Sequence, residues 1–267
     1  MNYRVFITLA ALTGAYSHAA ESQSTQLPFS LSSDIELFEQ NPSQEACSLL
    51  FSTALENLKK LPGELVKETL IIPLSKVAKT HTELVIDWVN NILFIKAPER
   101  NGFLAAVFLA ADLPQHARLL LDNTQEFTQL LGFSQERTNL LILVLITQIT
   151  LYDFKMAHQA VSLLSRGDPN FFIKKGPWGN ILHLITQLAM GPGDQQEEDP
   201  EIAILQAVFK TAELICIHAK IYAPTFFQET DAQGNTPAQV AAIAQESCSE
   251  NRNKTRALLK EIEFMLQ

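Results

Sequence analysis

Clusters of basic residues are missing from this sequence of 267 residues. It has 20 lysines and arginines against 29 aspartates and glutamates, a formal net charge of -9, and no basic run. Affinity for a phosphate backbone comes mainly from clustered lysine and arginine, so no nucleic acid is expected as a partner. Hydrophobic residues make up 47% of the chain and charged residues 18%, which is enough apolar material for a sizeable core.

Local signatures of catalysis and of metal binding are also lacking. The sequence has no G-x-S-x-G motif, no phosphate-binding glycine loop and no H-E-x-x-H pattern. The closest pair of ligand-type residues is Cys216 with His218, and residues two apart on a helix point to different sides. We therefore expect a protein that is not an enzyme and holds no cofactor or metal, although catalytic residues gathered from distant segments would leave no local signature.

Strand signals are almost absent, because no two alternating β-branched segments are joined by a glycine-containing two-residue turn. Apolar residues recur at helical spacing over residues 45–58, 64–74 and 76–95, and the apolar run 140–151 reads as a helix buried on most sides. The predicted fold class is all-α. Order is expected to begin near residue 34, where Ser33 or Asp34 can cap a helix.

The first residues have the order of a secretory signal peptide. Arg4 is the only charge ahead of an apolar run, and small residues at Ser17 and Ala19 provide an S-x-A cleavage site before Ala20. This order predicts a signal peptide over residues 1–19, a secreted or periplasmic location, and no stable membrane insertion after cleavage. An ordinary buried helix or a short anchor is the alternative, but the run is shorter than the roughly 18 residues of a spanning helix. A polar, flexible lead over residues 20–33 follows.

The second half of the chain contains loosely repeated units, each with two helices. Residues 231–241, DAQGNTPAQVA, resemble the start of an ankyrin repeat, whose D-x-x-G-x-T-P-L-H-x-A pattern uses glycine for the turn and threonine as the helix cap. Gln239 stands where that family has histidine. Residues 180–184, NILHL, look like a variant of the same start with Gly179 one position late, and residues 161–170 are similar to a repeat end.

The ankyrin resemblance implies a helical-repeat solenoid over residues 101–267, built of ankyrin-like helix pairs. Such units cannot bury their apolar faces alone, so neighbours must stack. The segment 191–200, GPGDQQEEDP, reads as an inserted exposed loop. A HEAT-like or irregular α-solenoid is the alternative. If Cys216 and Cys248 lie on neighbouring repeats they can form a disulfide, and two separate buried thiols are the other case.

A second resemblance lies in the helical module expected over residues 34–100. Leu61, Pro62 and Leu65, within the segment 61–74, resemble the L-P-x-E-[LI] opening of an F-box. That resemblance implies docking on the adaptor subunit of a ubiquitin ligase, with the repeats selecting the substrate. The same residues also describe a helix that starts at a proline and has a carboxylate in its first turn, and Thr69 interrupts the usual apolar pair.

The expected function is a non-catalytic protein–protein interaction scaffold, of the kind found in secreted bacterial ankyrin-repeat proteins. An F-box-like effector that recruits a host ubiquitin ligase, and a periplasmic helper of an envelope enzyme or stress response, are the alternatives. Aromatic and cationic side chains gather where the ankyrin family places its protruding finger, and interfaces favour such anchors. These candidate partner-binding residues are Phe171, Phe172, Lys174, Lys175 and Trp178. Phe172 and Trp178 can instead fill the gap between stacked units.

Overall fold

The computed structural model describes residues 31–58, 60–92, 98–121, 135–167, 176, 179–190 and 202–267. Every regular element in these ranges is a helix, which confirms the all-α class; the one strand-like pairing is an isolated bridge between Gly176 and Gly179. The expected signal peptide, the loop at 191–200 and the five finger residues lie outside the described residues. Those five are Phe171, Phe172, Lys174, Lys175 and Trp178.

The N-terminal helices pack around a cluster of aromatic and leucine side chains. In chain order they are α2 (Ser32–Gln40), α3 (Gln44–Leu58), α4 (Gly63–Val66), the π-helix η1 (Lys67–Ile71), α5 (Ile72–Thr80) and α6 (Thr82–Ile92). Helix α3 packs between α2 and α6, and the rings of Phe51 and Trp88 lie 4.7 Å apart between their centroids. Helix α3 matches the predicted segment 45–58 closely.

Two details of this region differ from the sequence-based predictions. Helix α2 begins at Ser32, with Leu31 at its cap position and no side-chain cap bond, so neither Ser33 nor Asp34 caps it. The single helix predicted over 76–95 is broken at His81, whose backbone leaves the helical region and whose ring lies edge-on to Phe38 at 5.0 Å. The apolar period continues through the break because both helices bury their faces in one core.

The helix predicted over 64–74 is continuous but contains the π-helical segment η1. Pro73 lies in the first turn of the following helix, α5. A proline has no backbone N–H and its ring clashes with the carbonyl four residues earlier, so the chain must widen just before it. We attribute the π-turn to Pro73.

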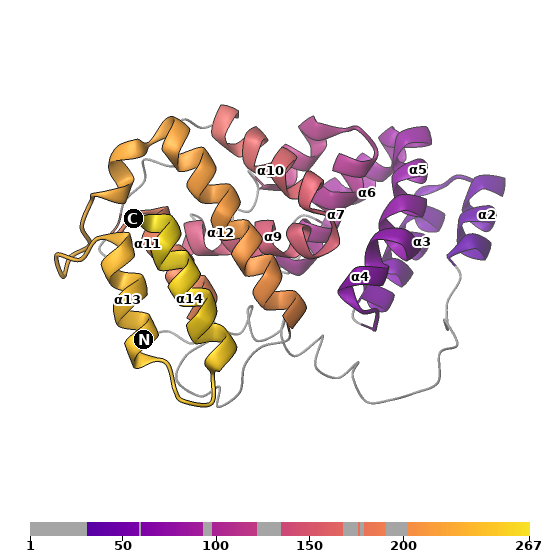
Figure 1. Cartoon of the computed structure of the whole chain (residues 1–267). Coiled ribbons are helices and arrows are strands. Elements are labelled where there is room, and N and C mark those ends of the chain that lie inside the picture. The colour runs from indigo at the N-terminus through magenta and orange to yellow at the C-terminus, as the bar shows by residue number, and fades with distance from the viewer. Residues whose placement is uncertain are drawn as a thin grey trace.

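The C-terminal helices pack in two rows (Figure 1). They are α7 (Pro98–Ala110), a helical stretch over 114–121, α9 (Gln135–Tyr152), α10 (Phe154–Gly167), α11 (Ile181–Met190), α12 (Ile202–Tyr222), the 3-10 helix η3 (Pro224–Phe227), α13 (Pro237–Ser247) and α14 (Asn253–Leu266). In one row α9 packs on α11 and α11 on α13. In the other α10 packs on α12 and α12 on α14. Helix α7 joins the halves by packing on both α5 and α9.

Two helices are apolar over most of their length. Every residue of α9 from Thr138 to Thr150 is buried, which confirms the prediction for the run 140–151. Helix α12 is, within the described ranges, the one helix long and apolar enough to cross a membrane, and 56% of its apolar window is buried inside the protein.

Candidate functional site

The turn before α13 is built by local hydrogen bonds of the residues that resemble an ankyrin start. One carboxylate oxygen of Asp231 accepts the backbone N–H groups of Gln233 and Asn235, each at 2.9 Å. Gly234 adopts a positive φ of 85°, which the turn requires and a glycine provides without strain. The side chain of Thr236 then caps the helix, and Pro237 occupies its first turn. The local chemistry predicted for this segment is confirmed.

His183 links the turn before α11 to the turn before α13. Its Nδ1 accepts the backbone N–H of Asn180 at 3.1 Å, so the ring proton lies on Nε2. Nε2 donates to the carbonyl oxygen of Asn235, also at 3.1 Å, in the following turn. Gly179, with φ of 97°, packs directly under this ring, because an added Cβ would stand 2.4 Å from it. Both ring nitrogens of His183 therefore bond backbone groups, one in each turn.

Gln239, in the turn before α13, makes one of the two kinds of hydrogen bond that His183 makes. Its Oε1 accepts the backbone N–H of Thr236 at 2.8 Å, as the ring of His183 accepts that of Asn180. The glutamine therefore keeps the bond within its own turn. The side chain of Gln239 is exposed.

Asn180 fixes the same junction from a fully buried position. Its Oδ1 accepts the backbone N–H of Leu182 at 3.0 Å, which caps α11. Its Nδ2 donates to the carbonyl oxygen of Phe226 at 3.0 Å and to the carboxylate of Glu229 at 3.3 Å, so it also holds the segment that follows α12. Together with His183, this side chain sets the spacing between two successive helix pairs.

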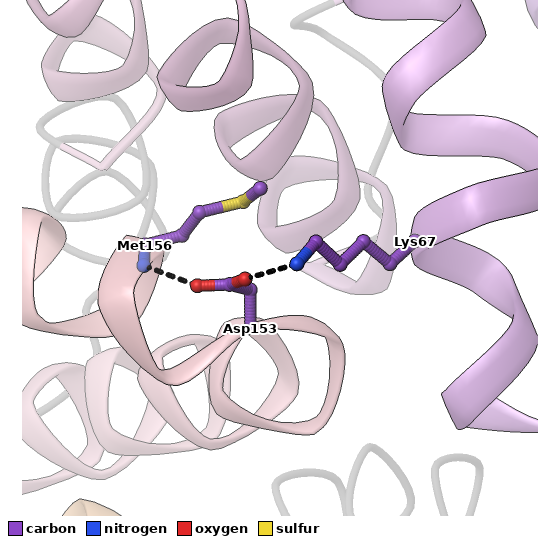
Figure 2. A network of polar contacts seen from close by, with 3 residues as sticks. All are labelled: Lys67, Asp153 and Met156. Carbon is purple, nitrogen blue, oxygen red and sulfur yellow. Dashed lines mark hydrogen bonds and ion pairs between the residues drawn. The ribbon is translucent and has the colours of Figure 1, made fainter.

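An ion pair connects the N-terminal helices to the two rows (Figure 2). The ammonium group of Lys67, on η1, lies 2.6 Å from one carboxylate oxygen of Asp153, in the turn between α9 and α10. The other carboxylate oxygen of Asp153 accepts the backbone N–H of Met156 at 3.0 Å and so caps α10. The π-helical segment η1 therefore contains Lys67, the residue that contacts Asp153 in the second half of the chain.

The pKa values of this pair reflect mutual stabilisation. The hydrogen bond to Asp153, followed by its charge, raises the pKa of Lys67. Burial acts to raise the pKa of Asp153, but the hydrogen bonds from Lys67 and from the backbone of Met156, with the charge of Lys67, outweigh burial and lower it. The stabilising contribution of Asp153 is therefore present above its ordinary value of 3.8 and lost as pH falls through the lowered pKa. That of Lys67 is present below 10.5 and lost as pH rises through the raised pKa.

A double-mutant cycle should separate the ion pair from the helix cap. Asp153→Asn retains a capping oxygen, and Lys67→Met retains the aliphatic stem. We expect a coupling free energy of about 0.5–1 kcal/mol at neutral pH, because the pair is partly exposed. Urea unfolding at neutral pH and again near pH 3 provides the measurement, with the coupling reduced at the lower pH. A cycle with no coupling at neutral pH would show that the contact contributes nothing to stability.

The L-P-x-E-L segment divides between core and surface. Leu61 is only 7% exposed and belongs to the core, as do Val66 and Leu70. Pro62 is exposed and Leu65 is 42% exposed. From the F-box resemblance we expected Leu61 to be a docking residue. Its side chain is buried inside the protein, so of the three expected docking residues only Pro62 and Leu65 are available to a partner.

A second cluster of rings joins α10 to α12. His218 stacks on Tyr222 and lies 5.6 Å from His158 between ring centroids, and Ser165 lies within 3.4 Å of its Nδ1. Burial, and then the charge of His158, lowers the pKa of His218, so its neutral form is favoured. Within the described ranges, no group of three or more histidine, cysteine, aspartate or glutamate side chains could hold a metal ion.

The three cysteines are buried, free thiols. Burial raises the pKa of Cys47 to about 12, and burial raises that of Cys216 to about 12 against the opposing charge of Lys220. A thiol with so high a pKa is protonated at neutral pH and is a poor nucleophile. Of the two cases left open for Cys216 and Cys248, this structure has separate thiols.

Three residues of structural importance were missed by sequence reasoning. They are Lys67, Asp153 and Arg252, whose guanidinium donates to the carbonyl oxygen of Met190 at 2.8 Å, at the end of α11. Asp153 directly precedes α10 and could have been recognised as a helix cap, whereas nothing local to Lys67 or Arg252 indicates a distant partner.

Comparison of this chain with protein-family models, with curated proteins and with solved structures finds no match.

Proposed function

We propose that this protein is a non-catalytic scaffold that binds other proteins through a stack of ankyrin-like helix pairs. The observation that carries the proposal is the bond from His183 to Asn235, which joins two turns that precede successive helix pairs. The packing of α9 on α11 on α13, and of α10 on α12 on α14, supports the same arrangement. In such a stack each unit contacts only its neighbours, so the turns and one helical face stay open to a partner.

The finger residues of the sequence analysis are the proposed contact surface. A stiff stack loses little conformational freedom on binding, and aromatic side chains with cations beside them make efficient anchors. We also propose that the protein enters the secretory route, and this part of the proposal rests only on the signal-peptide pattern of residues 1–19. If the mature chain stays in the periplasm, the partner is an envelope protein, which is the helper role considered above.

A capture experiment with matched variants tests this proposal. The bait is the chain from Ala20 onward, offered to a bacterial envelope extract and to a eukaryotic cell lysate. The variant Lys174→Glu, Lys175→Glu reverses two finger charges, and the control Lys76→Glu, Lys260→Glu reverses two exposed charges elsewhere. We expect a captured protein that the finger variant loses and the control retains. If wild type captures nothing beyond what an unrelated bait captures, the scaffold proposal is wrong.

An F-box-like effector is the second candidate, because Pro62, at the N-cap of α4, and Leu65, within α4, are both exposed. The variant to use is Pro62→Ala, Leu65→Ala, which leaves the buried Leu61 in place so that the core is undisturbed. Loss of a ubiquitin-ligase adaptor with this variant alone would favour the effector. An adaptor that never appears in the lysate capture would remove this candidate.

A further inference from the structure

Polar side chains link α10 to α12, which lie side by side in one row (Figure 1). In the first turn of α10 the ammonium group of Lys210 lies over the ring of Phe154, 5.8 Å from its centroid. Further along, His158 and Ser165 of α10 approach His218 of α12. We call these last three residues the histidine contact. Its charge can change near neutral pH, because imidazole is the side chain that ordinarily titrates between about pH 5 and 8.

The histidine contact pairs an exposed imidazole with a buried one. His158 is exposed, whereas His218 is 6% exposed, and their ring centroids lie 5.6 Å apart. The hydroxyl group of Ser165 donates to the carbonyl oxygen of Val161 at 2.5 Å, so its oxygen is left to accept from Nδ1 of His218 at 3.4 Å. Nδ1 therefore holds the proton of the neutral ring, and a second proton, taken up at Nε2, makes the buried ring a cation.

The charged groups of α10 and α12 give this cation no counter-charge. Those of α10 are all basic, namely Lys155, His158 and Arg166, and the helix contains no carboxylate. The one carboxylate of α12 is Glu213, five residues before His218 and therefore about 140° around the helix from it. The ring that stacks on His218 is the uncharged phenol of Tyr222.

The other helices packed on α12 add no carboxylate that compensates. From Thr138 to Tyr152 α9 has no charged side chain, and the one titratable group of α11 is His183, which bonds the turns before α11 and α13. The charged groups of α14 are Lys254, Arg256, Lys260, Glu261 and Glu263. Of the charges on all the described residues, that of His158 acts on His218, and after burial it is the second cause that lowers the pKa of this ring.

We infer that the histidine contact is a pH-sensitive joint between α10 and α12, closed while His158 and His218 are neutral and opened when acid makes both rings cationic. An opened joint takes up a proton on His218 more readily than a closed one. The stabilising contribution is therefore complete above the ordinary value of 6.5 and lost as pH falls from there through the lowered pKa. The contact of Lys210 with Phe154 contains no histidine, so acid leaves α10 attached at its first turn and frees the part around Ser165.

Hydrogen exchange of the whole mature chain, read by mass spectrometry at about pH 7.5 and about pH 5.5, measures this opening. The rates are corrected for the intrinsic effect of pH on exchange. We expect the amides of α10 around His158 and Ser165 to open about threefold more often, or more, at the lower pH. Two unit charges 5.6 Å apart produce a factor of about that size even at the dielectric constant of water.

Variants at position 158 test the role of charge, and the exposed position makes their folding safe. His158→Gln should reduce the acid response, because one of the two charges is gone. His158→Glu should reduce it further, because a carboxylate favours the cationic form of His218. His158→Lys has a permanent positive charge and should open more than His158→Gln already at about pH 7.5. Circular dichroism at neutral pH checks that all three keep the wild-type fold.

Two more variants complete the test. His218→Phe keeps a buried ring that cannot titrate, and the acid response of α10 should disappear. Lys76→Gln removes an exposed charge on α5 and should respond as wild type does. The inference is wrong if wild type, His158→Gln and His158→Glu respond equally to acid, or if His218→Phe opens as wild type does. These results involve no captured protein, so they are independent of the scaffold proposal.

Discussion

Replacing His183 by alanine is expected to lower the free energy of unfolding by about 3 kcal/mol, through a cavity, the buried N–H of Asn180 that loses its acceptor, and the lost bond to the carbonyl of Asn235. The ring is 1% exposed, and its two nitrogens bond the N–H of Asn180 and the carbonyl of Asn235. The loss should be largest in the last helix pair, because the bond to Asn235 is what joins its turn to the preceding one. Urea unfolding followed by circular dichroism measures the total, and hydrogen exchange of α13 and α14 amides localises it.

His183→Gln is the matched control for this substitution. Gln239 shows that a glutamine at the same place in a turn can accept the cap N–H. The glutamine variant should therefore keep the bond to Asn180 and lose only the one to Asn235, at a cost of about 1 kcal/mol. Equal costs for alanine and glutamine would show that the link to the next turn carries the whole effect. No cost for either variant would show that the two turns are held together without this side chain.

The helix starts that local chemistry defines were predictable from the sequence. Gly234, the capping Thr236 and Pro237 predicted the start of α13, and the observed Thr236 cap and the positive φ of Gly234 agree with it. The apolar spacing of α3 and the continuous apolar run of α9 likewise predicted the helices that form. In each case the signal lies within a few residues of the feature, where propensity and capping act.

Features that depend on tertiary contact were not predictable in the same way. The break at His81 has no glycine or proline beside it, and it occurs where the ring of His81 meets Phe38 from another helix. The contact of Lys67 with Asp153 requires the docking of η1 against the turn after α9, which no local pattern encodes. For the same reason the burial of Leu61, the residue that made the L-P-x-E-L segment look like a docking motif, became visible only in the fold.

Arg252 is the side chain whose loss should cost most. It is 4% exposed, at the start of α14, and its guanidinium donates to the carbonyl oxygen of Met190 at 2.8 Å and to the hydroxyl of Thr255 at 3.3 Å. Met190 ends α11, so the cation lies at the negative end of that helix, where its charge is favourable. We expect Arg252→Ala to cost about 4 kcal/mol, the sum of a lost charge-assisted bond, an unpaired carbonyl and a cavity.

Arg252→Met decides between two physical accounts of this residue. Methionine fills most of the volume but offers no donor, so if the bond to Met190 dominates, the variant should lose about 2 kcal/mol in urea unfolding. Burying a guanidinium also has a desolvation cost, and replacing a buried charge by an apolar side chain is neutral or stabilising when that cost exceeds the gain. We expect the first result, because the carbonyl of Met190 would lose its charged donor at a partly buried position. A methionine variant as stable as wild type would mean that Arg252 positions the last helix pair on α11 without stabilising it.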